Sequence, residues 1–145
     1  MDENPKIIVA AFTISNDSIK TMSIPNGPKK KLTKHIPHVK TMRSYPAVLI
    51  GRLGVSALFA RKGLGCEVMD FIKAWFVDKS NKTGCRFIVV DAYNETRPLD
   101  FYVKNGFAYL FRTEAEEKTY LGLAGTVSKI KTRLMYFDLI TLGLS

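Results

Sequence analysis

The stretch that most constrains the fold is Ala47–Val77, which reads as a strand, a loop and a helix. Its first part, Val48–Val55, is an apolar run typical of a buried strand, with Arg52 as its one charged residue. A helix is predicted from about Leu64 to Val77, because apolar residues there recur at spacings of three and four and would form one buried face. The residues of this face are Val68, Phe71, Ile72, Trp75 and Phe76. A strand leading into such a helix indicates an α/β fold.

The loop between this strand and helix has the composition of an anion-binding site. Backbone N–H groups at a helix start carry the positive end of the helix dipole and bind phosphate readily. Gly63 and Gly65 would let a ligand approach the backbone closely, while Arg61 and Lys62 add positive charge. The Walker pattern is absent, and the dinucleotide pattern fails because Val68 stands in the place of its third glycine. From the loop alone, a phosphate site and a plain tight turn are equally good interpretations.

Residues downstream of the helix complete a larger pattern. The strand-like run Phe87–Asp91 is followed by Asn94 and then by Arg97–Phe107, which contains Phe-Tyr-x-x-x-Gly-Phe about 40 residues after Gly-x-Gly. With the loop Arg-Lys-Gly-Leu-Gly, this pattern resembles the core of the GCN5-related N-acetyltransferase (GNAT) superfamily. More narrowly, the fragments LGRLGV, GLG, VDAYNE and FYVKNGF resemble the toxin branch that acetylates the amino acid on charged tRNA. The resemblance covers roughly Ile50–Phe111.

The expected fold is a single α/β domain over residues 1–145, with a mixed sheet. The other expected elements are strands at Lys6–Ile14, Cys85–Tyr93, Phe107–Phe111 and Leu134–Ile140, a turn at Ser15–Ser18, a helix at Arg97–Asn105 and a helical or irregular insertion at Glu114–Lys131. The last two strands are expected to pair as antiparallel neighbours. The resemblance implies the family's splayed sheet flanked by helices, with acetyl-CoA in the wedge between two strands. It also implies that the family's N-terminal strand and helix pair are lacking from this chain.

The same resemblance assigns contacts to acetyl-CoA as co-substrate. It places the pyrophosphate on the amides of Lys62–Gly65 and the pantetheine arm along the backbone of Leu53–Val55. The amide around Val55 becomes the oxyanion donor, and Asn94 matches a position whose amide touches the CoA arm. The predicted contacts are Leu53, Gly54, Val55, Arg61, Lys62, Gly63, Leu64, Gly65 and Asn94.

Acetyl transfer also needs a proton for the departing thiolate. Tyr102 matches the family's general acid, and a phenol with a pKa near 10 is protonated at neutral pH. The alternative is a core tyrosine packed beside Phe101 and Phe107. Asp91 and Glu95 are both candidates for the general base, and the alternative for each is that it caps a turn. An α-amine acceptor, which titrates near 7.7–8.0, needs less help from a base than a lysine side chain does.

Positive charge is concentrated in one block of the chain. The chain carries a formal charge of +9, and Ser18–Cys66 contains ten lysines and arginines with no aspartate or glutamate. Within the block, three prolines exclude a single regular element from Ile19–Ser44. The predicted nucleic-acid contacts are Lys29, Lys30, Lys31, Lys34, Lys40 and Arg43. The block suits CoA phosphates or a nucleic-acid backbone, and the alternative is a solvated loop. His35 and His38 lack a third ligand nearby, so no metal site is predicted.

The leading hypothesis is therefore an acetyl-CoA-dependent enzyme that acetylates the α-amine of aminoacyl-tRNA. The resemblance implies a ribbon-helix-helix antitoxin as protein partner, and the sequence leaves open whether the chain forms a homodimer. The absence of a long apolar run or signal peptide predicts a cytoplasmic protein without a membrane partner. Two alternatives stay open: an N-acetyltransferase for small molecules or proteins, and a catalytically degenerate module that binds nucleic acid or protein.

Overall fold

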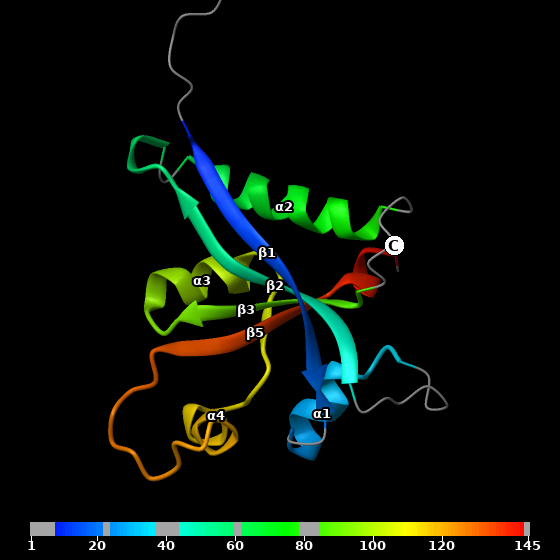
Figure 1. The fold of residues 1–145 in the computed structure, drawn as a ribbon, viewed down its shortest axis with the longest axis vertical. Coiled ribbons are helices and arrows are strands. Elements are labelled where there is room, and N and C mark those ends of the chain that lie inside the picture. Colours follow the sequence, from blue (N-terminus) through cyan, green and yellow to red (C-terminus); the bar gives the residue numbers. More distant parts are fainter. Residues whose placement is uncertain (1–7, 22–23, 37–43, 60–61, 79–84, 144–145) are drawn as a thin grey trace, which may run out of the picture.

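A computed structural model of the chain describes residues 8–21, 24–36, 44–59, 62–78 and 85–143. Within these residues, five strands form one sheet in the order β1-β2-β3-β5-β4 (Figure 1). The strands are β1 (Ala10–Lys20), β2 (Ser44–Val55), β3 (Phe87–Tyr93), β4 (Ala108–Tyr109) and β5 (Thr132–Asp138). The helices are α1 (Asn26–Leu32), α2 (Leu64–Val77), α3 (Thr96–Lys104) and α4 (Glu114–Tyr120), with 3-10 turns at Ala57–Phe59 and Leu139–Gly143. Within the described residues, no helix has both the length and the apolar character needed to cross a bilayer.

The sheet is mixed, as predicted. Strand β2 pairs antiparallel with β1 and parallel with β3, while β5 pairs antiparallel with both β3 and β4. The predicted antiparallel pairing of the last two strands is thereby confirmed.

Strands β2 and β3 separate halfway along their length, and we call this point the fork. Their parallel pairing runs from Ala47 opposite Phe87 to Ile50 opposite Val90. Beyond it, β2 continues to Val55 paired with β1, and β3 continues to Tyr93 paired with β5 (Figure 1). The predicted splay of the sheet is therefore confirmed.

A β-bulge lies at the fork. Strand β1 pairs Thr13 with Arg52 but Ile14 with Ile50, so Gly51 has no opposite residue. A bulge bends its strand and increases the local twist. The bulge at Gly51 therefore explains why β2 turns away from β3 directly after Ile50.

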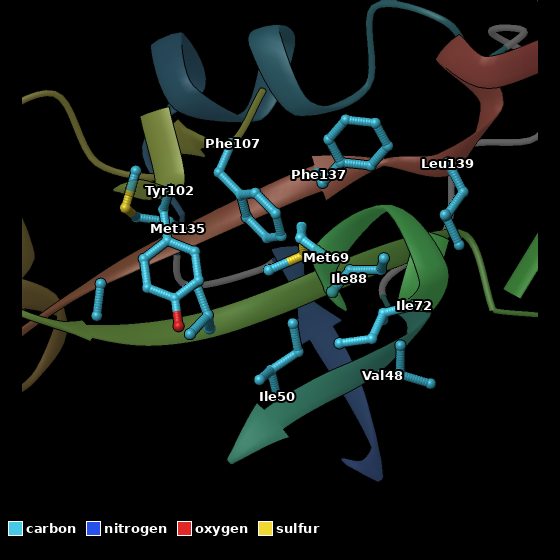
Figure 2. Packing of buried hydrophobic residues seen from close by; sticks show 12 residues of the cluster. Val48, Ile50, Met69, Ile72, Ile88, Tyr102, Phe107, Met135, Phe137 and Leu139 are labelled. Carbon is cyan, nitrogen blue, oxygen red and sulfur yellow. The ribbon is translucent and has the colours of Figure 1, made fainter. Parts of the chain in front are cut away.

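The two faces of the sheet carry separate cores. On the face covered by α2 and α3, the buried cluster consists of Val48, Ile50, Met69, Ile72, Ile88, Val90, Ala92, Tyr102, Phe107, Met135, Phe137 and Leu139 (Figure 2). On the opposite face, beside α1, it consists of Ile19, Ile24, Leu32, Tyr45, Ala47, Phe87, Val89, Leu110, Phe111 and Tyr136. Alternate residues of β3 point to the two cores, as a strand buried on both faces requires. We refer to these as the α2 face and the α1 face.

Some element predictions need correction. Strand β1 extends to Lys20, so the expected turn at Ser15–Ser18 is wrong, because this segment pairs with the first half of β2. The basic segment contains the short helix α1, and Pro28 is buried in its first turn. Strand β4 has only two residues.

The buried face of α2 also differs from the prediction. Helix α2 has the predicted bounds, yet Phe71 and Trp75 are 59% and 50% exposed. Met69 and Ile72 point into the core, while the ring of Phe71 lies 6.5 Å from that of Phe12 at the margin of the sheet. The buried stripe is therefore rotated around the helix from the predicted one.

Candidate functional site

The N-terminus of α2 has no side-chain cap among the described residues, and two glycines shape it. Gly63 is the N-cap residue with φ of 78°, a left-handed conformation that favours glycine, and no side chain caps the helix. At Gly65, a β-carbon would lie 2.9 Å from Cε1 of Phe101, so the close approach of α3 requires glycine. Lys62 and Gly63 are exposed, and Leu64 and Gly65 are half-buried. This geometry suits the predicted pyrophosphate contact, which stays a prediction; Arg61 lies outside the described residues.

Within the described residues, the second half of β2 pairs with another strand on one side only, where β1 lies. Leu53, Gly54 and Val55 pair with Phe12, Ala11 and Ala10 of β1. On the side facing β3, no strand among the described residues pairs with β2 after Ile50. The predicted backbone contacts at Leu53–Val55 thus lie on the edge that borders the fork, as an extended ligand arm would need.

Tyr102 is anchored by its ring and not by its hydroxyl. The residue is 8% exposed, and its ring centroid lies 5.1 Å from that of Phe101 and 5.4 Å from that of Phe107. Its hydroxyl makes no hydrogen bond within the described part of the chain. Every fully buried polar side-chain atom in that part does have a hydrogen-bond partner, so the hydroxyl oxygen of Tyr102 is not fully buried and contacts solvent. Figure 2 shows this oxygen pointing across β3, away from Phe107.

The position of Tyr102 relates it to the fork. It belongs to the same buried cluster as Ile50 and Val90, the last pair before the strands separate. Burial raises the pKa of Tyr102, so the phenol stays protonated at neutral pH. The core-tyrosine alternative is correct for the ring, but it does not account for the hydroxyl. A proton-donor role for Tyr102 stays a prediction.

Asn94 has a structural role that the sequence did not indicate. Its Nδ2 donates to Oε1 of Glu114 at 2.8 Å and to the carbonyl of Ile130 at 3.0 Å, and its backbone N–H donates to Lys131. These bonds tie the end of β3 to α4 and to the segment before β5. Because both Nδ2 protons are engaged, the predicted contact of Asn94 with CoA is limited to the amide oxygen.

The predicted nucleic-acid contacts lie partly on α1. Lys29, Lys30 and Lys31 belong to this helix, and Lys34 follows it; all but the half-buried Lys29 are exposed. The helix rests on the α1 face through buried Leu32, and Lys31 Nζ lies 3.5 Å from the carbonyl of Tyr109. Lys40 and Arg43 fall outside the described residues.

A cavity of about 230 Å³ opens on the α1 face between β1, β3 and α4. We call it the Asp91 cavity. It is lined by Asp17, Ser18, Ile19, Lys20, Val89, Asp91, Leu110, Glu117, Tyr120, Leu121, Thr132 and Leu134. Both candidate bases are exposed; Asp91 lines this cavity, whereas Glu95 does not and stands at the N-cap of α3 without forming a side-chain cap.

The carboxylates of the cavity have distinct environments. Partial burial, and then the charge of Asp17, raise the pKa of Asp91, although much of the residue's surface stays exposed to solvent. Glu117 is 2% exposed and accepts hydrogen bonds from Arg133 Nε and from the backbone N–H of Leu134, both at 2.8 Å. Burial nevertheless raises the pKa of Glu117. Sequence reasoning missed Asp17 and Glu117, because Asp17 followed Asn16 in an apparent turn and nothing local linked Glu117 to β5.

The fold can be compared with solved structures. AtaT complexed with acetyl-methionyl-tRNAfMet has a TM-score of 0.57 at 17% identity, and the match covers 94% of this chain and 65% of AtaT. A variant of KacT has a TM-score of 0.60 at 17% identity, with 93% and 65% covered. AtaTR bound with acetyl-CoA has a TM-score of 0.54 at 17% identity, with 94% and 64% covered.

This chain therefore spans about 65% of the length of the structures it matches. No protein-family model and no curated protein sequence matches it. The shared architecture confirms the predicted fold: the chain folds like AtaT and KacT.

Proposed function

We propose that this chain is an acetyl-CoA-dependent N-acetyltransferase of the toxin type and that its acceptor is the α-amine of an aminoacyl-tRNA. The observation that carries the proposal is the fork. There, the edge of Leu53–Val55 that pairs with no described strand faces the gap between β2 and β3, and the buried cluster that contains Ile50 and Val90 includes Tyr102. The start of α2, which has no side-chain cap among the described residues, follows this edge in the chain. Solved structures of the same fold, AtaTR and an AtaT variant, are bound to acetyl-CoA.

The residues at the fork match the needs of acetyl transfer. The amides of Lys62–Gly65 would hold the pyrophosphate, and the edge of Leu53–Val55 would hold the pantetheine arm. Acetyl-CoA supplies an activated thioester carbonyl. The Val55 amide would stabilise negative charge on its oxygen, and Tyr102 would give its proton to the departing sulfur. Because burial raises the pKa of Tyr102, the phenol carries its proton at neutral pH.

The charge distribution favours a nucleic-acid acceptor over a small molecule. The basic helix α1 lies on the α1 face, which also carries the Asp91 cavity. Leu110 and Ile19 belong both to the core beside α1 and to the wall of the cavity. If the tRNA backbone lay along α1, the aminoacylated end of the tRNA would point toward the sheet.

The proposed setting is the cytoplasm, where charged tRNA is found. The proposed protein partner is a small antitoxin of the ribbon-helix-helix class. An AtaT variant has been solved with the C-terminus of the antitoxin AtaR, which supports a partner of this kind.

The test is mass spectrometry of charged tRNA after incubation with acetyl-CoA and the chain. The proposal predicts one acetyl group on the aminoacyl moiety with the wild type and little with Tyr102→Phe. No mass gain with either protein would contradict it. Acetylation of free amines or proteins, with charged tRNA left unmodified, would favour the alternative acceptors.

A further inference from the structure

The Asp91 cavity adjoins the fork from the face opposite Tyr102. Asp91 directly follows Val90, the last residue of β3 that pairs with β2. Val90 and Ala92 point into the cluster that contains Tyr102, whereas Val89 and Asp91 line the cavity. Because successive residues of a strand point to opposite faces, Tyr102 and Asp91 approach the same segment of β3 from its two sides.

The walls of the cavity combine apolar and acidic side chains. Its apolar part is formed by Ile19, Val89, Leu110, Tyr120, Leu121 and Leu134. Its volume of about 230 Å³ is below the roughly 300–1,000 Å³ of pockets that hold drug-sized ligands. A cavity of this size suits a single amino-acid side chain and not a coenzyme.

The charged groups around the cavity favour a cation. Glu117 is paired with Arg133, so its charge is balanced within the protein. Asp17 and Asp91 both line the cavity, and Asp17 raises the pKa of Asp91 through charge repulsion. Lys20 is the one basic residue of the lining, and it is exposed, as Asp17 and Asp91 are, so the two aspartates outnumber it at the open side of the cavity. A bound ammonium would relieve the repulsion between the two aspartates.

We propose that the Asp91 cavity is the acceptor pocket: an apolar aminoacyl side chain fills it, and the α-ammonium is held by Asp91 and Asp17. This inference rests on the proposed function. It narrows the acceptor to aminoacyl esters with an apolar side chain, and it makes Asp91 rather than Glu95 the general base.

The chemistry balances with these two residues. Asp91 accepts one proton from the ammonium and leaves a neutral amine. The amine nitrogen then forms its bond to the thioester carbonyl carbon, the C–S bond breaks, and sulfur takes the proton of the Tyr102 hydroxyl. The remaining extra proton on nitrogen passes to the Tyr102 oxygen, and Asp91 releases its proton to solvent. No oxidant or further reactant is needed.

Small esters can test the pocket without tRNA. The probes are L-leucine methyl ester, glycine methyl ester, which lacks the side chain, and N-acetyl-L-leucine methyl ester, which lacks the cation. Binding is measured by calorimetry with the wild type, Asp91→Asn, Asp17→Asn and the control Glu95→Gln, which changes an exposed carboxylate outside the cavity.

We expect the wild type to prefer the leucine ester over both other probes. Loss of a hydrogen bond to a charged group should weaken that binding about tenfold in Asp91→Asn. Glu95→Gln should bind like the wild type, and circular dichroism should show that all variants are folded. Equal binding of the acetylated ester, or unchanged binding in Asp91→Asn, would overturn the inference.

Failure of this inference and failure of the proposed function give different results. If charged tRNA is acetylated at the same rate by Asp91→Asn and the wild type, the proposed function stands and the pocket assignment fails. If the leucine ester binds in an Asp91-dependent manner while acetyl-CoA does not bind, the pocket stands and the acetyltransferase proposal fails.

Discussion

Ile50 of β2 lies opposite Val90 of β3 in the last parallel pair of the sheet, and the bulged residue Gly51 comes directly after it. This relationship places a change in twist at the point where the two strands stop sharing hydrogen bonds. Two features proposed to bind acetyl-CoA border this point: the edge of β2 that pairs with no strand in the described part of the chain, and the cluster that contains Tyr102. The start of α2 comes a few residues after that edge.

The contact between Gly65 and Phe101 gives a first prediction. In Gly65→Ala the new methyl group would meet Cε1 of Phe101 at 2.9 Å and Cζ at 3.3 Å. Overpacking of this kind should lower the free energy of unfolding by about 1–3 kcal/mol. Gly54→Ala is the matched control, since a β-carbon there has nothing within 4 Å. Urea denaturation of both variants checks this, and equal stabilities would show that Phe101 moves aside freely.

Two substitutions of Tyr102 should have separate effects on acetylation activity and on the stability of the fold. Tyr102→Phe keeps the ring contacts with Phe101 and Phe107 and removes a hydroxyl that has no hydrogen-bond partner among the described residues. Acetylation should fall about 100-fold or more, with the melting temperature unchanged. Tyr102→Ala should instead destabilise the fold by about 3–5 kcal/mol. Full activity of Tyr102→Phe would exclude this residue as proton donor.

The pair Asp17 and Asp91 predicts a pH-dependent stability. Burial and the charge of Asp17 raise the pKa of Asp91 above its ordinary value of 3.8. At pH values just above 3.8, Asp91 is therefore still protonated in the folded state but already ionised in the unfolded state. Stability from this group therefore falls as the pH rises through this range. Asp17→Asn removes the repulsion and should stabilise the protein near pH 7 more than near pH 4. Identical effects at both pH values in urea denaturation would show that the two carboxylates do not interact.

The lysines of α1 give a prediction for nucleic-acid binding. Lys30 and Lys34 are exposed, and Lys30→Glu with Lys34→Glu should weaken tRNA binding. The salt dependence of the affinity should also decrease, by about 0.7–0.9 in log–log slope for each phosphate that the variant no longer neutralises. The control is Lys104→Glu, a reversal at an exposed residue of α3. If the control weakens binding equally, the effect is one of net charge and α1 has no special role.

Local patterns predict the elements that local chemistry determines. Helix α2 begins and ends as predicted because its apolar period is regular and Gly63 supports the turn before it. The full length of strand β1 is not predictable in this way, because its extension to Lys20 depends on pairing with Ser44–Ala47, which is distant in sequence. For the same reason, the exposure of Phe71 and Trp75 could not be read from spacing, since it depends on how α2 lies over β1 and β2.

The candidate site was predictable to a similar extent. The family resemblance carried by the strand, the glycine loop and the Tyr102 motif implied the fork, while the roles of the residues assigned to it stay predictions. The Asp91 cavity was not predictable, because β1, β3, β5 and α4 each contribute to its wall and their alignment is a tertiary property. Asn94 shows the same limit, since its partners Glu114 and Ile130 lie 20 and 36 residues away.

We infer that the fork and the start of α2 together bind acetyl-CoA, and a calorimetric titration of the wild-type chain with acetyl-CoA is the decisive measurement. We expect saturable binding of one acetyl-CoA per chain, weakened in Gly65→Ala and retained in Tyr102→Phe. The absence of any binding heat in the folded wild-type protein would contradict this inference and leave an α/β domain whose fork holds no coenzyme.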